Sequence, residues 1–496
     1  MTFNSWQFLI FLPVTVILYF IVPHKFRWLI LLIASYYAYM SYNPWLVFLI
    51  LATTTVSYLS GLLMPKIKKT GLKKLLLAIT IIVCLGLLIY FKYFNFLLSS
   101  VINFLNLFSM NIHSVSLDII LPIGISFYTF QTLSYVVDVY KGKFEPEKHF
   151  GYYALFVSFF PQLVAGPIER PENLLPQLKE HHKLNKDDLL AGLQLLAVGF
   201  FRKCVIADFC GVFVNNVYSD LNNANSLALL IAGGLFMVQL YCDFGGYSEI
   251  AAGSARVMGI KLSINFDRPF KETSLQRSMK KWHITLTSWF MDYVYIPLGG
   301  NRKGKARQIL NIFIVYALCG LWHGANWTFV LWGLFVGTIM IIESLLRKPI
   351  RKYAQEHHIN YNKPWINIIR RIGVFLILVF SSYFFRAQSI TDLGVIYTRL
   401  FTAVGFDKNY FVSTFAVLGM KLIDVIEIAL LLMVMLRLFN LAYDQVGLTI
   451  EQENERSVTK KYSKNIIMLL VVIAVGLGWF VLISSDATSA FVYFQF

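Results

Sequence analysis

The sequence predicts an all-α membrane protein that crosses the bilayer many times. Of its 496 residues, 57% are hydrophobic and only 14% are charged, whereas soluble domains carry about a quarter charged residues. Apolar runs long enough for a helix to cross about 30 Å of hydrocarbon recur along the whole chain. We therefore expect about 10–12 spanning helices around a core of re-entrant and broken helices.

The first three apolar runs occupy residues 6–22, 26–42 and 45–64. Lys25 and Arg27 follow the first run, an uncharged turn follows the second, and a lysine cluster follows the third. The positive-inside rule places both basic groups in the cytoplasm, so we expect the N-terminus outside a multi-pass cell membrane protein. Because the chain lacks a basic n-region and a small-residue cleavage site, run 6–22 is interpreted as a spanning helix rather than a signal peptide.

The alternation of loops between the inside and the outside continues through runs 75–97 and 118–137. The segment between these two runs would lie outside, and it contains no Lys or Arg. Later basic or mixed-charge stretches are expected inside as well, and the last run is expected to leave an aromatic tail outside. The inner stretches are 302–307, 347–352 and 441–464, the last run is 465–484, and the tail is 491–496.

The centre of the sequence, residues 150–300, has a different pattern. Its apolar runs are short, rich in polar residues and interrupted by prolines and glycines, including Gly245 and Gly246. Broken helices at membrane depth require cover by protein or by a water-filled cavity. We therefore expect residues 150–325 to be re-entrant and interfacial helices that form the functional core. We interpret 1–496 as one membrane domain. It would comprise N-terminal spanning helices (1–149), a catalytic core (150–346) and C-terminal spanning helices (347–496).

Charge and missing motifs exclude several classes of function. The formal net charge is +17, but the basic residues stand in short blocks between apolar runs, so we expect membrane lipids and no nucleic acid as partners. HExxH, Walker and GxSxG motifs and cysteine-histidine metal clusters are missing from the sequence. We therefore expect no metal and no permanently bound cofactor, and we exclude a metalloprotease, an ATP-driven pump and an α/β-hydrolase.

Of the nine histidines, His283 and His323 are the candidates for chemistry. Run 308–322 covers only about 22 Å before His323, and run 326–346 returns to the next basic cluster. Gly320 and Gly324 permit a tight reversal, which predicts His323 at the tip of a hairpin within the bilayer. An ionisable residue so deep is by default functional. The alternatives are a neutral histidine bridging two helices for His323 and an interfacial position for His283.

The type of chemistry follows from what surrounds these histidines in the sequence. A histidine without an evident serine or cysteine partner suits general-base catalysis on a hydroxyl that the substrates bring. Cys319 lies close to His323, but a buried free thiol is usually a small hydrophobic residue.

Further polar residues, Asp243, Glu249, Asn265 and Arg268, are predicted at comparable depth. The functional interpretation is that they orient the histidines or line a tunnel for the donor. The alternative is a buried ion pair of Asp243 or Glu249 with Arg256. It is favoured for Glu249, because Arg256 lies about two helical turns farther along.

Several long motifs, in this order, resemble the bacterial membrane-bound O-acyltransferases, in particular the branch that acetylates alginate and peptidoglycan. The motifs are LPIGISFYTFQ (121–131), FPQLVAGPI (160–168), YCDFGGYS (241–248), NFDRP (265–269), WHITLT (282–287), YIPLGGNR (295–302) and LWHGANW (321–327). The resemblance implies the fold of that family, with His323 as the catalytic histidine and His283 as a second active-site histidine. Trp282, Trp322 and Asn326 lie in the same motifs and are expected to support the site or line the tunnel.

The resemblance also implies the substrates. The donor would be acetyl-CoA or another acyl thioester on the cytoplasmic side, and the acyl group would pass through a membrane tunnel. The acceptor would be an extracytoplasmic cell-wall polysaccharide, often reached through an SGNH-type acetyltransferase partner. Two alternatives stay open. One is D-alanyl or other acyl transfer to a cell-wall polymer, and the other is a non-enzymatic transporter of a lipid-linked substrate, although matching half-repeats are not visible.

Overall fold

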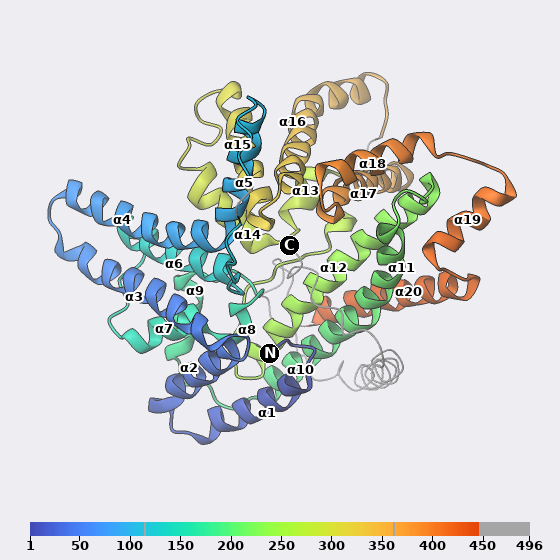
Figure 1. Cartoon of the computed structure of the whole chain (residues 1–496). Coiled ribbons are helices and arrows are strands. Elements are labelled where there is room, and N and C mark those ends of the chain that lie inside the picture. The colour runs from blue at the N-terminus through green and yellow to red at the C-terminus, as the bar shows by residue number, and fades with distance from the viewer. Residues whose placement is uncertain (114–115, 361–362, 446–496) are drawn as a thin grey trace. The chain divides into compact units, whose positions relative to one another are not determined.

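The computed structural model describes residues 1–113, 116–360 and 363–445. These residues form helices and connecting loops, with one isolated antiparallel bridge between Phe266 and Trp282 and no strand among them. The predicted all-α, multi-spanning fold class is confirmed (Figure 1). Six helical segments in the described part are long and apolar enough to cross a membrane, so the count of about 10–12 stays a prediction. They are Pro44–Lys66, Thr70–Asn106, Lys186–Ser219, Ser226–Arg256, Trp327–Glu356 and Pro364–Arg386.

The chain divides into two compact units. The first contains Met1–Leu196 and Ile250–Ser263, and the second contains Ala197–Glu249 and the chain from Ile264 onward. The predicted division at residues 149 and 346 stays a prediction. Both candidate histidines belong to the second unit.

The first unit begins with helices at the predicted runs 6–22, 26–42 and 45–64, and the third of these lies within a candidate span, Pro44–Lys66. Its helices are α1 (Trp6–Ile21), α2 (His24–Met40), α3 (Val47–Leu63), α4 (Thr70–Leu88), α5 (Phe94–Asn106), α6 (Ile125–Tyr140), α7 (Phe150–Ser158), α8 (Phe160–Leu163), α9 (Pro171–Lys179) and most of α10 (Lys186–Phe200). Buried polar groups join them, since the Tyr153 hydroxyl of α7 donates to Ser57 Oγ of α3 at 2.7 Å. The Tyr153 ring also packs on Tyr135 of α6, with 4.4 Å between the ring centroids.

Two predicted runs differ from the observed helices. Run 75–97 lies inside a longer helix, Thr70–Asn106, in which a π-helical turn (η3, Ile89–Tyr93) joins α4 to α5. Run 118–137 becomes helical only from Ile125, because Gly124 adopts the left-handed conformation with φ 76° immediately before it.

The prediction of short, broken apolar segments between residues 150 and 300 is wrong for two long stretches. α10 continues through the π-helix η4 (Phe201–Ala207) into α11 (Asp208–Ser219), and α12 (Ser226–Arg256) runs unbroken through Gly245 and Gly246. Both stretches are mostly buried inside the protein. Their charged side chains are paired there with side chains of opposite charge, which offsets the cost of burying them. Shorter helices do occur elsewhere in this region, as in α7 to α9, α13 (Leu275–Lys280) and α14 (Ile284–Phe290).

The second unit completes the fold after α14. Its remaining helices are η5 (Pro269–Lys271), η6 (Met291–Tyr295), α15 (Lys305–His323), α16 (Trp327–Glu356), α17 (Pro364–Arg386), α18 (Ile390–Thr402), α19 (Lys408–Leu418) and α20 (Leu422–Gln445). The predicted last run 465–484, the tail 491–496 and most of the stretch 441–464 lie outside the described residues.

The predicted hairpin that ends at His323 is formed by α15 and α16, which lie side by side (Figure 1). A Cβ atom on Gly320 would lie 2.1 Å from the Phe329 carbonyl oxygen. A Cβ atom on Gly333 would lie 2.0 Å from the Tyr316 carbonyl oxygen. The two backbones therefore touch, as small residues allow in membrane helix pairs.

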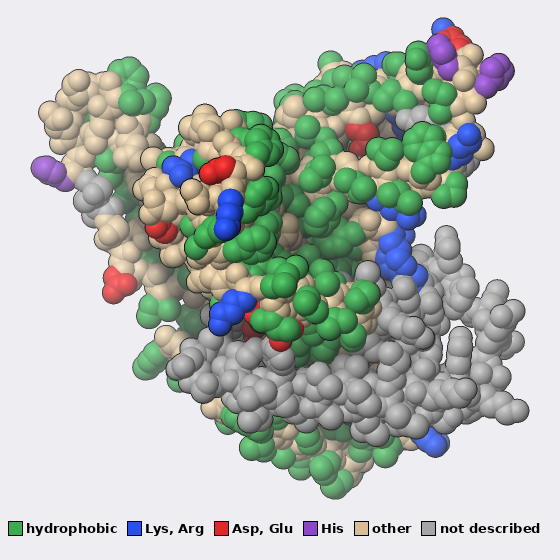
Figure 2. Space-filling view, turned by 90° about the vertical axis from the view of Figure 1, so that its right-hand side faces the viewer, with side chains coloured by type: hydrophobic (Ala, Val, Ile, Leu, Met, Phe, Trp, Pro, Cys, Tyr) green, Lys and Arg blue, Asp and Glu red, His purple; other side chains and the backbone are tan. Residues whose placement is uncertain are grey.

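Large hydrophobic side chains are exposed in both units. Trp6 is 68% exposed, Trp45 76% and Ile372 54%. Figure 2 shows hydrophobic side chains over broad stretches of the described surface, with Lys and Arg in small separate groups. Exposed apolar surface on this scale fits contact with lipid rather than water.

Candidate active site

His283 lies immediately before α14, in a left-handed conformation with φ 45°. Only 2% of its surface is exposed, and its ring packs against Phe244 (4.6 Å between centroids) and Trp322 (5.6 Å). Burial lowers the pKa of His283 from 6.5 to about 3. The imidazole is therefore neutral at physiological pH.

Asn265 fixes which ring nitrogen of His283 carries the proton. Its Nδ2 donates to Ser248 Oγ at 3.0 Å, so its Oδ1 is the acceptor for Thr285 Oγ1 at 2.6 Å and for His283 Nδ1 at 3.2 Å. Because an amide oxygen only accepts, the neutral ring holds its proton on Nδ1. Nε2 is then the nitrogen with the basic lone pair.

His323 is the last residue of α15 and is 5% exposed. Aromatic rings surround its imidazole, with centroids at 5.1 Å for Trp322, 5.3 Å for Trp332 and 5.0 Å for Phe385. Cys319 Sγ lies 4.0 Å from His323 Nε2, one helical turn back. Trp322 contacts both imidazoles, so the structure brings the two predicted histidines to one indole.

A buried cluster of charges lies on η4 and α12. Arg202 has no exposed surface and pairs with Glu249 at 2.5 Å, while Lys203 pairs with Asp243 at 2.8 Å and with Asp208 at 2.7 Å. The predicted pairing of Asp243 or Glu249 with Arg256 is therefore wrong. Two helical turns along one helix are about 11 Å, whereas the neighbouring helix brings Arg202 and Lys203 into direct contact. Arg256 pairs instead with Asp188 at 2.8 Å, inside the first unit.

The remaining predicted residues have other positions. Asp243 is held in the ion pair with Lys203, and Trp282 packs on Phe266, with 5.1 Å between centroids. Arg268 adopts a left-handed φ of 51° at the start of η5. Asn326 caps α16, since its Oδ1 accepts from Thr328 N, and its Nδ2 donates to the carbonyl of Gln388 at 2.9 Å. Of the predicted set, His283, His323, Asn265 and Trp322 form the connected group.

Sequence reasoning missed several neighbours of the histidines. Ser248 and Thr285 complete the hydrogen bonds of Asn265, and Trp332 and Phe385 enclose His323. Cys319, in contrast, is a neighbour of His323 that the sequence itself indicated. Its position four residues before His323 indicates that both lie on one face of a helix. Within the described residues, three or more His, Cys, Asp or Glu are nowhere grouped so that they could hold a metal ion.

Fold and site together define a multi-pass membrane enzyme with a buried pair of histidines. Residues 148–385, which include both histidines, match the model of the membrane-bound O-acyltransferase (MBOAT) family. A probable alginate O-acetylase of Pseudomonas syringae pv. tomato is 35% identical over 410 residues, which are 81% of this chain and 75% of the relative. A peptidoglycan O-acetyltransferase of Helicobacter pylori is 33% identical over 422 residues, covering 78% of this chain and 77% of the relative.

A teichoic acid D-alanyltransferase of Bacillus subtilis is more distant, at 26% identity over 54% of this chain and 69% of the relative. This chain belongs to the membrane-bound O-acyltransferase family, which confirms the resemblance seen in its motifs. It is accordingly an O-acyltransferase.

Proposed function

We propose that this protein takes an acetyl group from a cytoplasmic thioester, acetyl-CoA, and transfers it across the membrane for O-acetylation of a cell-envelope polysaccharide. The observation that carries the proposal is the contact of His283 and His323 with one indole, inside the segment that matches the acyltransferase family. Relatives named for alginate and peptidoglycan acetylation match most of the chain, which favours acetyl over D-alanyl transfer.

His323 is the general base in this proposal. Its imidazole removes the proton from the acceptor hydroxyl as the hydroxyl oxygen attacks the carbonyl carbon of the thioester. The C–S bond then breaks, and the imidazolium returns the proton to the departing thiolate. The rings of Trp322, Trp332 and Phe385 limit access of water to this point, which favours transfer to the hydroxyl over hydrolysis.

His283 serves a different role, because its Nδ1 proton is directed to Asn265. A neutral ring in this tautomer offers Nε2 as an acceptor and has no second proton to donate. It suits positioning of a hydroxyl or of a neighbouring side chain better than polarisation of the thioester carbonyl, which requires a donor.

The setting of the reaction is also part of the proposal. The distribution of basic residues supports an N-terminus outside the cell membrane and a donor that arrives from the cytoplasm. On the other side, an SGNH-type acetyltransferase would receive the acetyl group or share the acceptor polysaccharide.

The decisive test replaces His323 with alanine in protein reconstituted into liposomes with acetyl-CoA. We expect acetyl transfer to fall by a factor of about 10²–10⁴, the usual contribution of a general base. His357→Ala is the matched control, because His357 is an exposed histidine immediately after α16, and it should leave the rate unchanged. Wild-type transfer by a well-expressed His323→Ala variant would exclude the proposal.

Mass spectrometry of the product separates the remaining alternatives. An acetyl ester on the polysaccharide supports the proposal, and a D-alanyl ester would replace it with the other acyl group. Purified protein that neither transfers nor hydrolyses the thioester would indicate a transporter.

A further inference from the structure

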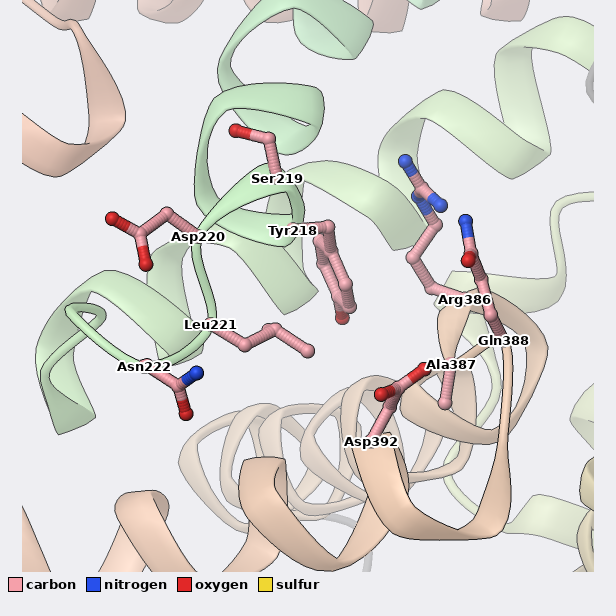
Figure 3. A pocket seen from close by; sticks show the side chains of 9 residues that line it. All are labelled: Tyr218, Ser219, Asp220, Leu221, Asn222, Arg386, Ala387, Gln388 and Asp392. Atoms are coloured by element: carbon pink, nitrogen blue, oxygen red, sulfur yellow. The ribbon is translucent and has the colours of Figure 1, made fainter.

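A polar pocket of about 250 Å³ lies in the second unit, at the ends of α11 and α17 (Figure 3). One side consists of residues 218–222, which end α11 and begin the following turn. The other consists of residues 386–388, which end α17, and Asp392 in the first turn of α18. Given about 30 Å³ per water, the pocket has room for roughly eight waters or one small ligand unit.

The Tyr218 hydroxyl is the feature that points to a ligand. Its oxygen is buried and has no hydrogen-bond partner among the described residues. Figure 3 shows the hydroxyl directed toward the side of the pocket formed by Ala387 and Asp392. A buried hydroxyl without a partner costs about 1–3 kcal/mol, so such a group calls for a bound polar molecule.

The remaining lining is suited to hydroxyl groups. Arg386 is held over the Tyr218 ring, 4.9 Å from its centroid, and donates to Asn215 Oδ1 at 3.0 Å. Asp220, Asp392, Asn222 and Gln388 add carboxylate and amide oxygens that accept from hydroxyls. Two carboxylates against one guanidinium make the lining net negative, which disfavours an anionic ligand.

The pocket is tied to the loop that carries His323. The Phe385 ring, adjacent in sequence to Arg386, packs on the His323 imidazole, and Asn326 donates to the Gln388 carbonyl at 2.9 Å. α15 and α17 each follow a basic stretch of the sequence. They end at His323 and Arg386, which belong to the contacts just described. By the positive-inside rule this end faces away from the cytoplasm, as an acceptor site must.

We propose that this pocket binds one neutral sugar unit of the polysaccharide that receives the acetyl group. The sugar hydroxyls would form hydrogen bonds with Tyr218 Oη, Asp392 and Arg386. The adjoining stretch of the polysaccharide would lead toward His323. The role as an acceptor site rests on the proposed acetyl transfer, whereas the binding of a sugar does not.

The test measures binding of two hexasaccharides by calorimetry to the full chain in lipid nanodiscs. One is the neutral hexamer of N-acetylglucosamine, and the other is an anionic hexamer of mannuronic acid. We expect the neutral hexamer to bind more tightly. Tyr218→Phe, which removes only the hydroxyl, should weaken its binding about five- to tenfold, the effect of one hydrogen bond. Tyr353→Phe, at an exposed tyrosine on α16, is the matched control and should bind like the wild type.

The variant His323→Ala separates this proposal from the proposed function. It should bind the neutral hexamer with unchanged affinity, whatever happens to acetyl transfer. Binding of neither hexamer, tighter binding of the anionic hexamer, or equal binding by Tyr218→Phe and the wild type would overturn the sugar site. It would also be overturned if Tyr218→Phe released an extracytoplasmic protein partner while the hexamers failed to bind, because the pocket would then be a protein-docking site.

Discussion

Replacing Asn265 with aspartate tests how the protein keeps His283 neutral. The substitution is nearly isosteric, and Thr285, Ser248 and His283 can all still donate to the new side chain. Only its charge is new. A carboxylate beside Nδ1 stabilises the imidazolium, which the apolar surroundings of the wild-type ring disfavour.

The size of the effect follows from the geometry. Two unit charges at the 3.2 Å of the present contact attract by about 5 kcal/mol at an effective dielectric constant of 20, an upper limit here. A nearby opposite charge usually raises the pKa of such a group by about 1–3 units. The pKa of His283, now about 3, should therefore rise to between about 4 and 6. The active neutral ring would then be lost as the pH falls through this range.

The assay is the release of coenzyme A from acetyl-CoA by reconstituted protein between pH 4.5 and 8, followed by mass spectrometry. The wild type should show no loss of activity from His283 in this range, whereas Asn265→Asp should lose activity on the acid side and recover it toward pH 8. Thr285→Val removes the other hydrogen bond to Oδ1 without adding charge, so its pH profile should keep the wild-type shape. Superimposable acid limbs for Asn265→Asp and the wild type would refute this explanation of how His283 stays neutral.

Two further substitutions test the surroundings of the histidines. Cys319→Ala should keep the transfer rate within about threefold, because the thiol packs as a small hydrophobic group beside His323. The rate is measured in single-turnover assays. A loss above a hundredfold would instead indicate an acyl-cysteine intermediate. Gly245→Ala should destabilise the protein by about 1–3 kcal/mol, because its Cβ would lie 2.1 Å from Arg202 Nη2. Gly234→Ala on the same helix meets nothing within 4 Å, and similar thermal melting of the two variants would contradict this packing.

The membrane fold and the position of His323 at the end of a hairpin could be predicted because their signals are local. Long apolar runs, blocks of lysine and arginine, and the glycines around His323 each act within a few residues. The hairpin of α15 and α16 could therefore be predicted from one stretch of sequence. The resemblance to a family added His283, whose surroundings alone left an interfacial position open.

Partners from distant segments could not be predicted in the same way. Glu249 and Arg256 share a helix, so Arg256 seemed the natural partner, but Arg202 reaches Glu249 from a neighbouring helix. Phe385 packs on His323 from more than sixty residues away, and no periodicity indicates that contact. The glycines at 245 and 246 suggested a broken helix, whereas they make room for a buried arginine inside an unbroken one.

The π-helical turn η4 shows how much the core depends on one irregularity. A π-helix accommodates an additional residue relative to the regular winding, and here Arg202 and Lys203 both reach acidic groups of α12 from it. Deleting a single residue between 201 and 207 would let the segment wind more regularly. The helices on either side would keep their relative register, because a π-helical turn absorbs the additional residue as a local bulge. The shortened chain would gain a smoother helix and lose the local widening from which both cations meet their carboxylates.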